Sequence, residues 1–190
     1  PKGGIFVGSH SGSLIGALVS RGKRKGIGFA GLVSVGGESD LSIGNLCAAT
    51  LDDPSVTSYM LFLETLRDAE GLRRFAEAAA QRGKPIAAYK LGRSEAAAEL
   101  AMSHTGSLAG ADEVSDAFLK GCGIARVESF EGLLEVMPLL EALPASATAR
   151  RGRVGVVTTT GGGAAMAVDQ MALRGVDVVP ASNETREKLR

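Results

Sequence analysis

The chain has 190 residues, of which 45% are hydrophobic, and its 21 Lys and Arg residues balance 21 Asp and Glu residues. Because nucleic acids and anionic membranes are usually bound by a basic face, the zero net charge speaks against both kinds of partner. No apolar stretch approaches the roughly 20 residues of a membrane span. The two cysteines have no metal-ligand spacing and fit a reducing compartment, so we expect a cytoplasmic protein without a metal site.

Short apolar strands alternate with helical segments up to residue 143. Strands are predicted at 4–8, 29–36, 58–64, 85–92 and 124–128, and helices at 11–26, 41–51, 71–83, 94–102, 111–123 and 130–143. Nearly continuous apolar strands separated by helices predict an α/β fold, with a parallel sheet covered by helices on both faces. Such sheets bind their ligands outside the carboxyl ends of the strands.

The pattern changes after residue 143. Residues 144–153 are small, polar and basic, which predicts a linker. The segments that follow are a strand at 154–160, a glycine turn at 161–163, a helix at 164–175, a strand at 176–180 and the start of a helix at 182–190. One strand–helix–strand unit cannot cover its own sheet. We therefore expect residues 1–143 to form one domain and residues 154–190 to begin a second α/β domain of a larger protein.

Two strand-to-helix turns are candidates for binding phosphate. Their residues are Ser9, Ser11 and Gly12 in GSHSGSLIG, and Gly161, Gly162, Gly163 and Ala164 in TTTGGGAAMAVD. Free backbone N–H groups at a helix start, with hydroxyls beside them, suit phosphate oxygens. Ordinary serine capping and an ordinary tight turn also explain these residues. A third glycine segment, GIGFAG, precedes a strand instead of following one, so it is not a dinucleotide-binding fingerprint.

His104 lies in the glycine- and hydroxyl-rich stretch AMSHTGSLAG. No second His, Cys pair or acidic cluster lies at metal-ligand spacing, and no G-x-S-x-G segment supports a serine hydrolase. His104 is therefore interpreted as a nucleophile that accepts a phosphoryl group, with Ser103, Thr105 and Gly106 as neighbouring phosphate-binding residues. Such a histidine needs a carboxylate to fix its tautomer. Glu64, at the end of an apolar strand, is the candidate, although a solvated strand-end glutamate is the simpler explanation.

Three segments together resemble the NDP-forming acyl-CoA synthetases, the family of acetate–CoA ligase (ADP-forming) and relatives of succinyl-CoA synthetase. They are GSHSGSL at 8–14, LFLE at 61–64 and SHTGSLAG at 103–110. VSVGGESDLSIGNL and DDPSV are also similar to family segments, except that Gly37 stands where many members carry Asn. VVTTTGGGAAMAVD resembles the start of the family's second ligase domain. The likeness runs through almost the whole chain.

The resemblance implies a flavodoxin-like first domain and part of a second CoA-ligase domain. It implies that His104 carries phosphate between acyl phosphate and ADP or GDP, while carboxylic acid plus CoA and acyl-CoA are interconverted. Glu64 would orient the histidine, and the two glycine turns would be helix starts that face the phosphohistidine. CoA, ATP or GTP, and Mg²⁺ are expected mainly in a CoA-binding domain and an ATP-grasp domain or subunit outside this chain. The chain alone is expected to be inactive, and the full protein to be an oligomer.

Two other functions stay open at this point. One is a non-catalytic, synthetase-like region of a protein acetyltransferase, which would be expected to lack a histidine such as His104. The other is a flavodoxin-like module that binds a nucleotide or flavin, although the chain has no Trp and only two Tyr to stack on a flavin ring. The sequence does not indicate the acyl group, the choice between ADP and GDP, or the physiological direction.

Overall fold

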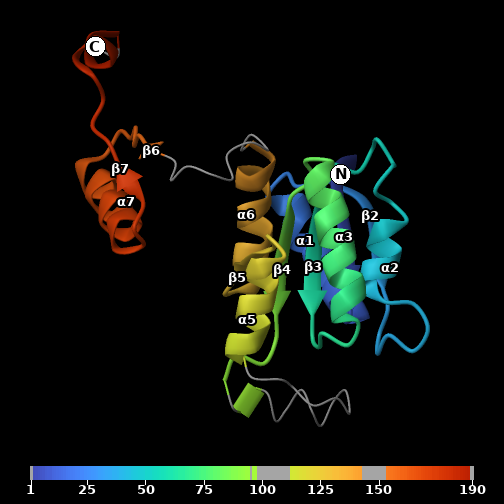
Figure 1. Cartoon of the computed structure of the whole chain (residues 1–190). Coiled ribbons are helices and arrows are strands. Elements are labelled where there is room, and N and C mark those ends of the chain that lie inside the picture. The colour runs from blue at the N-terminus through green and yellow to red at the C-terminus, as the bar shows by residue number, and fades with distance from the viewer. Residues whose placement is uncertain (1, 95, 98–111, 143–152, 189–190) are drawn as a thin grey trace. The chain divides into compact units, whose positions relative to one another are not determined.

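The structure, a computed structural model, describes residues 2–94, 96–97, 112–142 and 153–188 (Figure 1). The chain divides into two compact units, Pro1–Ala145 and Ser146–Arg190, and each is described by itself. Within the described residues, none of the helices combines the length and the apolar character needed to cross a membrane.

The first unit is built on a five-stranded parallel sheet with the strand order β2-β1-β3-β4-β5. The strands are β1 Lys2–Ser9, β2 Phe29–Ser34, β3 Ser58–Leu63, β4 Ile86–Lys90 and β5 Ala125–Val127. The helices are α1 Gly12–Arg24, α2 Ile43–Ala48, α3 Ala69–Gln81, α5 Asp112–Gly121 and α6 Phe130–Ala142. The predicted α/β fold is confirmed. The helix predicted at 94–102 lies for the most part outside the described residues.

The central strand β3 explains why the sheet needs helices on both faces. All six of its residues are buried. Tyr59, Leu61 and Leu63 belong to the apolar core that includes residues of α2, α3 and α5. Met60 belongs to the opposite core, with Leu18 of α1 and residues of α6. Continuous apolar strands such as this one are typical of parallel sheets that are covered on both sides.

The strand order places a reversal between β1 and β3. The connection through α1 carries the chain from β1 to β2 at one edge of the sheet, whereas β3 continues toward β4 and β5 at the other. Open α/β sheets bind their ligands at such a reversal, outside the carboxyl ends of the strands. The fold therefore points to the ends of β1 and β3, at Ser9 and Leu63, as the place for a site.

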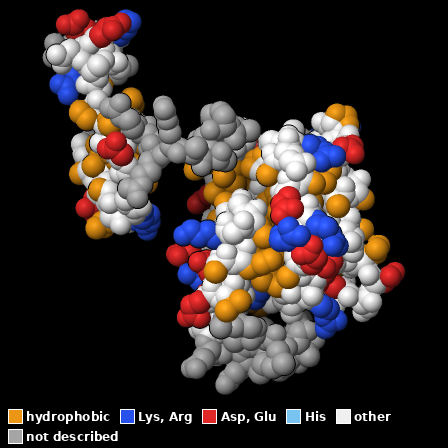
Figure 2. All heavy atoms as spheres, in the orientation of Figure 1, with side chains coloured by type: hydrophobic (Ala, Val, Ile, Leu, Met, Phe, Trp, Pro, Cys, Tyr) orange, Lys and Arg blue, Asp and Glu red, His pale blue; other side chains and the backbone are white. Residues whose placement is uncertain are grey.

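Charged side chains of both signs are interspersed on the face of the first unit that Figure 2 shows. Exposed ion pairs also form between helices and within one helix. Lys25 Nζ lies 2.8 Å from Glu135 Oε1, and Arg73 Nη2 lies 2.6 Å from Glu70 Oε1. Exposed pairs of this kind contribute about 0–1 kcal/mol each, so they adjust the surface without determining the fold.

The second unit is a small strand–helix–strand–helix segment. Its elements are β6 Arg153–Val154, α7 Gly161–Leu173, β7 Asp177–Val178 and α8 Asn183–Lys188, with β6 and β7 parallel. The predicted extent of the strand at 154–160 is wrong, because the ladder ends at Val154 and Val157 is 81% exposed. The glycines at 161–163 are not a separate turn. They form the first turn of α7, behind the N-cap residue Thr160.

Candidate functional site

The carboxyl ends of β1 and β3 bring two predicted site segments together. Ser9, the last residue of β1, pairs in register with Phe62 of β3. The backbone N–H of His10 then donates to the Phe62 carbonyl oxygen at 3.1 Å. Glu64 follows β3 directly, so it lies at the same edge of the sheet as the turn that leads from His10 into α1. The predicted phosphate-binding turn and the predicted carboxylate are therefore neighbours.

The serines of the turn shape it and leave the start of α1 without a side-chain cap. The Ser9 hydroxyl is fully buried, donates to the Ser11 carbonyl at 2.7 Å and accepts from the Ser11 N–H at 3.0 Å. Ser11 is the N-cap residue of α1, but its hydroxyl lies against the Ser13 hydroxyl at 3.2 Å and makes no capping hydrogen bond. Ordinary serine capping is therefore not the role of Ser11. Backbone N–H groups of the first turn of α1, at exposed Gly12 and Ser13, can face an anion.

His10, for which no role is predicted from the sequence, is buried at this edge. Its side chain contacts the backbone after β3, because Nδ1 accepts from the Glu64 N–H at 2.8 Å and from the Thr65 N–H at 3.4 Å. Its Nε2 lies 3.3 Å from Glu38 Oε1. That separation is slightly longer than a usual N–H···O hydrogen bond, and Nε2 has no hydrogen bond of normal geometry within the described part. The contact between His10 Nε2 and the Glu38 carboxylate is therefore electrostatic.

Glu38 is held in place by its own backbone and by α2. Its φ of +53° lies in the left-handed region, which costs a residue with a Cβ atom roughly 1–2 kcal/mol. Its Oε1 accepts from the Ile43 N–H at 2.8 Å. Burial raises the pKa of Glu38, but the nearby His10 ring and the Ile43 N–H outweigh burial, so that the pKa lies below its usual value. Glu38 is thus a carboxylate at neutral pH.

The lowered pKa of Glu38 predicts a pH-dependent part of the stability. Because the folded-state pKa lies below the unfolded value of about 4.3, the carboxylate stabilises the fold above that value, and this contribution is lost as the pH falls through the folded-state pKa. We expect the urea midpoint of the wild type to fall more between about pH 5 and pH 3 than that of Glu38→Gln. Circular dichroism during urea unfolding at both pH values measures this difference. Equal falls in the two proteins would contradict it.

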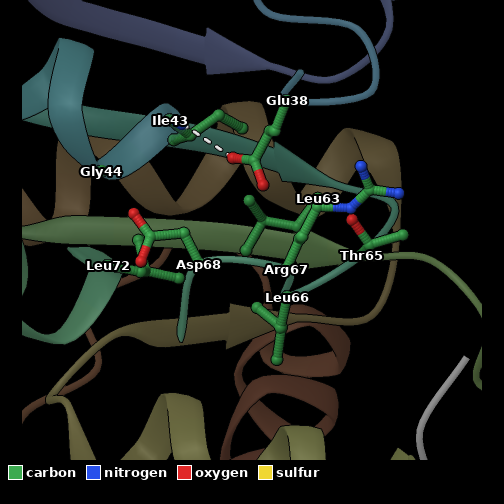
Figure 3. A pocket seen from close by; sticks show the side chains of 9 residues that line it. All are labelled: Glu38, Ile43, Gly44, Leu63, Thr65, Leu66, Arg67, Asp68 and Leu72. Atoms are coloured by element: carbon green, nitrogen blue, oxygen red, sulfur yellow. Dashed lines mark hydrogen bonds between the residues drawn. The ribbon is translucent and has the colours of Figure 1, made fainter. Parts of the chain in front are cut away.

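A small pocket opens beside Glu38 (Figure 3). Its lining residues are Glu38, Ile43, Gly44, Leu63, Thr65, Leu66, Arg67, Asp68 and Leu72. The Asp68 carboxylate accepts from the Ser42 hydroxyl at 2.7 Å and from the Gly71 N–H at 2.9 Å, which lowers the pKa of Asp68 and caps α3. Both carboxylates of the pocket are thus engaged by protein groups. The described residues contain no cluster of three or more side chains that could hold a metal ion.

The predicted site residues that lie outside the described part of the chain are Ser103, His104, Thr105 and Gly106. The described residues on either side show where that segment is anchored. The chain leaves the sheet at Lys90, the end of β4, and α5 begins at Asp112. Arg93 Nε lies 4.0 Å from Asp112 Oδ2, and Arg126 of β5 also pairs with Asp112. Both anchors therefore lie at the carboxyl edge of β4 and β5.

The second unit presents the other predicted helix start. α7 begins at Gly161 behind the N-cap residue Thr160, whose side chain makes no capping hydrogen bond. Among the residues that the structure describes, a Cβ atom added at Gly161 or at Gly162 would meet no atom within 4 Å. At Gly163 it would lie 2.5 Å from the Thr160 hydroxyl. Glycine at 163 therefore leaves room for the Thr160 hydroxyl beside the first turn, and the two preceding glycines leave the backbone open within the described part of this unit.

Sequence comparison relates the chain to CoA ligases. The sequence model described as succinyl-CoA ligase like flavodoxin domain matches residues 2–140. The chain is 34% identical over 192 residues to an ADP-forming acetate–CoA ligase of Methanocaldococcus jannaschii, across 100% of this chain and 26% of that relative. It is 32% identical over 171 residues to an ADP-forming 4-hydroxybutyrate–CoA ligase of Nitrosopumilus maritimus, across 89% of this chain and 24% of that relative. The chain thus spans about a quarter of the length of each.

Structural comparison agrees with the sequence. A dinucleotide forming acetyl-coenzyme A synthetase 1 of Ca. Korarchaeum cryptofilum, solved in complex with phosphate and ADP, is similar to this chain with a TM-score of 0.81 and 29% identity. The similarity covers 95% of this chain and 39% of that protein. The sequence match over residues 2–140 and the structural similarity therefore point to the same fold.

Proposed function

This chain belongs to the succinyl-CoA ligase like flavodoxin domain family, and on that premise we propose that it carries the phosphoryl-transfer site of an NDP-forming acyl-CoA synthetase. The observation that supports this most is the position of Glu64 at the reversal point of the sheet, where its N–H donates to His10, the residue before the uncapped start of α1 at Ser11. Because the chain spans about a quarter of its CoA-ligase relatives, the complete reaction is assigned to the full-length protein.

The proposed reaction transfers phosphate in three steps. An oxygen of inorganic phosphate attacks the thioester carbonyl of an acyl-CoA, and CoA leaves as its thiol. A ring nitrogen of His104 then attacks the phosphorus of the acyl phosphate, and the carboxylate leaves. An oxygen of the terminal phosphate of ADP or GDP finally attacks the phosphohistidine and frees the ring. The reverse direction activates a carboxylic acid and consumes a nucleoside triphosphate.

Glu64 is assigned the role of orienting His104. A carboxylate that accepts one ring N–H leaves the lone pair of the other nitrogen free to attack phosphorus. Leu63, the residue before Glu64, pairs with Lys90, where the chain leaves the sheet toward His104. This register supports the assignment, because it puts Glu64 beside one anchor of the histidine segment.

The two helix starts are assigned to binding the phosphoryl group. A phosphorylated histidine carries a charge close to −2, and the positive end of a helix dipole stabilises such a charge by about 0.3–2 kcal/mol. The absence of a capping hydrogen bond from the side chains of Ser11 and Thr160 supports this role, because the N–H groups of α1 and α7 keep their capacity to donate. The residues assigned beside His104 are Ser103, Thr105 and Gly106.

The remaining ligands are assigned to the full-length protein. CoA and ATP or GTP would be bound mainly by a CoA-binding domain and an ATP-grasp domain or subunit, with Mg²⁺ neutralising the phosphates of the nucleotide there. Residues 154–190 would begin a second CoA-ligase domain after the linker at 144–153, and the protein would act as a cytoplasmic oligomer. The relatives are named for acetate and 4-hydroxybutyrate, so short carboxylic acids are the first substrates to test.

The nucleotide product tests this function. We expect full-length protein with ATP, Mg²⁺, CoA and a panel of short carboxylic acids to form acyl-CoA together with equal amounts of ADP and phosphate. Reactions without the acid serve as the control for simple ATP hydrolysis. Formation of AMP and pyrophosphate would contradict the proposal. So would acetyl transfer to protein lysines without any acid-dependent release of ADP, which the acetyltransferase alternative predicts.

A further inference from the structure

His10 is a buried imidazole for which the proposed reaction has no use. Only 6% of the residue is exposed. Its ring lies between the Glu38 carboxylate and the backbone at Glu64 and Thr65. A buried polar ring is costly unless its nitrogens are satisfied, so the arrangement calls for an explanation beyond packing.

The contacts of His10 define its tautomer. Nδ1 accepts from the Glu64 N–H at 2.8 Å, so it carries a lone pair and no proton. In the neutral ring the proton is then on Nε2, which faces Glu38 Oε1 at 3.3 Å. Neither nitrogen is therefore offered to a phosphoryl group. The ring instead links a carboxylate on one side to the backbone on the other.

The backbone that His10 holds has just left the sheet. β3 ends at Leu63, and the carbonyl of the peptide group that joins Leu63 to Glu64 still accepts from the Leu91 N–H at 2.8 Å, whereas the N–H groups of Glu64 and Thr65 point to a partner outside the ladder. The His10 Nδ1 atom supplies the acceptor that both N–H groups face. Glu38, on the other side of the ring, is anchored to the start of α2 through the Ile43 N–H at 2.8 Å.

Glu38 also has an unusual backbone conformation. Its φ of +53° is unusual for a residue other than glycine, and strained conformations persist where the surrounding structure determines them, often at functional sites. A continuous set of contacts thus runs from α2 through Glu38 and His10 to the peptide group of Glu64.

We propose that His10, oriented by Glu38, is a positioning residue that holds the peptide group of Glu64 and thereby fixes the direction of the Glu64 carboxylate for its proposed role of orienting His104. The inference rests on the role proposed above for Glu64. It assigns His10 no direct contact with the substrate. Its effect on the reaction is therefore an effect on geometry, which should change kcat and leave the binding of CoA and acid unchanged.

Two variants of His10 separate its two contacts. His10→Asn places an amide oxygen near the position of Nδ1 and keeps an acceptor for the Glu64 N–H. His10→Gln places an amide nitrogen near the position of Nε2, which keeps a donor toward Glu38 and loses that acceptor. Both variants are assayed in the full-length protein by acyl-CoA formation and by the rate of phosphoryl labelling from ATP. Their melting temperatures serve as the control for folding.

We expect His10→Asn to keep kcat within about threefold of the wild type and His10→Gln to lower it about tenfold or more, with KM values unchanged in both, because small errors of alignment slow group transfer strongly. Equal kcat values in the two variants would overturn the inference, as would an effect on KM alone. These results would leave the proposed function intact if the wild type still takes label on His104. A wild type without label on His104 would instead overturn the proposed function, and this inference with it.

One measurement on the wild type holds even if a variant fails to fold. In the full-length protein labelled with ¹⁵N-histidine, the inference predicts that His10 shows an unprotonated Nδ1 and a protonated Nε2 at neutral pH, with the signal assigned by its loss in His10→Asn or in His10→Gln. A protonated Nδ1 could not accept from the Glu64 N–H and would overturn the inference.

Discussion

Replacing His104 by Ala should abolish phosphorylation of the full-length protein. With labelled ATP and Mg²⁺, the wild type should acquire a label that is stable in base and lost in acid, as expected for phosphate on a ring nitrogen. Alanine removes the nucleophile, and the two ring nitrogens of His10 face the Glu64 N–H and the Glu38 carboxylate instead of a phosphoryl group. Acyl-CoA formation should fall to background in the same variant, because the phosphoryl group of ATP reaches the carboxylic acid only through His104 in the proposed reaction.

His10→Ala is the matched control, since it removes the only other histidine of the chain. His10 is 6% exposed, and its Nδ1 is occupied by the Glu64 N–H. We therefore expect His10→Ala to be labelled more slowly than the wild type but still on His104. Label that survives in His104→Ala and disappears in His10→Ala would reverse the assignment of the nucleophile.

Glu64→Gln should lower kcat by about 100-fold or more, with little change in melting temperature. Glutamine keeps the shape of the side chain but cannot stabilise the positive ring that forms when His104 is phosphorylated. Groups that orient or exchange protons with a nucleophile contribute about 10²–10⁴-fold to the rate. A partly exposed carboxylate at a strand end adds little to stability. Acyl-CoA formation and thermal unfolding, measured on the same preparation, separate the two effects.

Glu135→Gln controls for the loss of a carboxylate as such. Glu135 lies on α6 and pairs with Lys25 at 2.8 Å in an exposed position, so its loss should leave kcat unchanged. A Glu64→Gln variant that keeps turnover within about threefold of the wild type would show that Glu64 is not the orienting group. A large fall in the melting temperature of Glu64→Gln would point to a structural role instead.

The fold of the first unit could be predicted from the sequence because apolar runs form most of its central strands. β3 is the clearest case, since each of its residues is buried and the five residues after Ser58 form one uncharged run, YMLFL. The strand predicted at 154–160 was too long. An apolar run forms a strand only where a partner strand is present, and β7 offers only Asp177–Val178 for pairing with Arg153–Val154. The glycines before Ala164 were predicted as a turn, yet they take helical conformation behind Thr160.

The candidate site could be predicted in part. Ser9 and Glu64 were found because each follows or ends an apolar strand, and carboxyl ends of parallel strands share an edge. The pair of His10 and Glu38 could not be found this way, because the two residues meet only through the pairing of Ser9 with Ser34 and the turn after β2. A usable signal was nevertheless present, since His10 also follows a strand at that edge. No residue pattern around Glu38 predicts its left-handed backbone conformation.

The most direct test of the proposed chemistry is the position of the phosphoryl group in the working enzyme. Full-length wild-type protein is incubated with ATP and Mg²⁺, digested at alkaline pH to preserve phosphohistidine, and analysed by tandem mass spectrometry. The peptide that contains AMSHTGSLAG should carry one phosphoryl group, located on His104, and that group should disappear when CoA and a carboxylic acid are added. Turnover of ATP to ADP and acyl-CoA with phosphate on His10, or with none on this chain, would contradict the account.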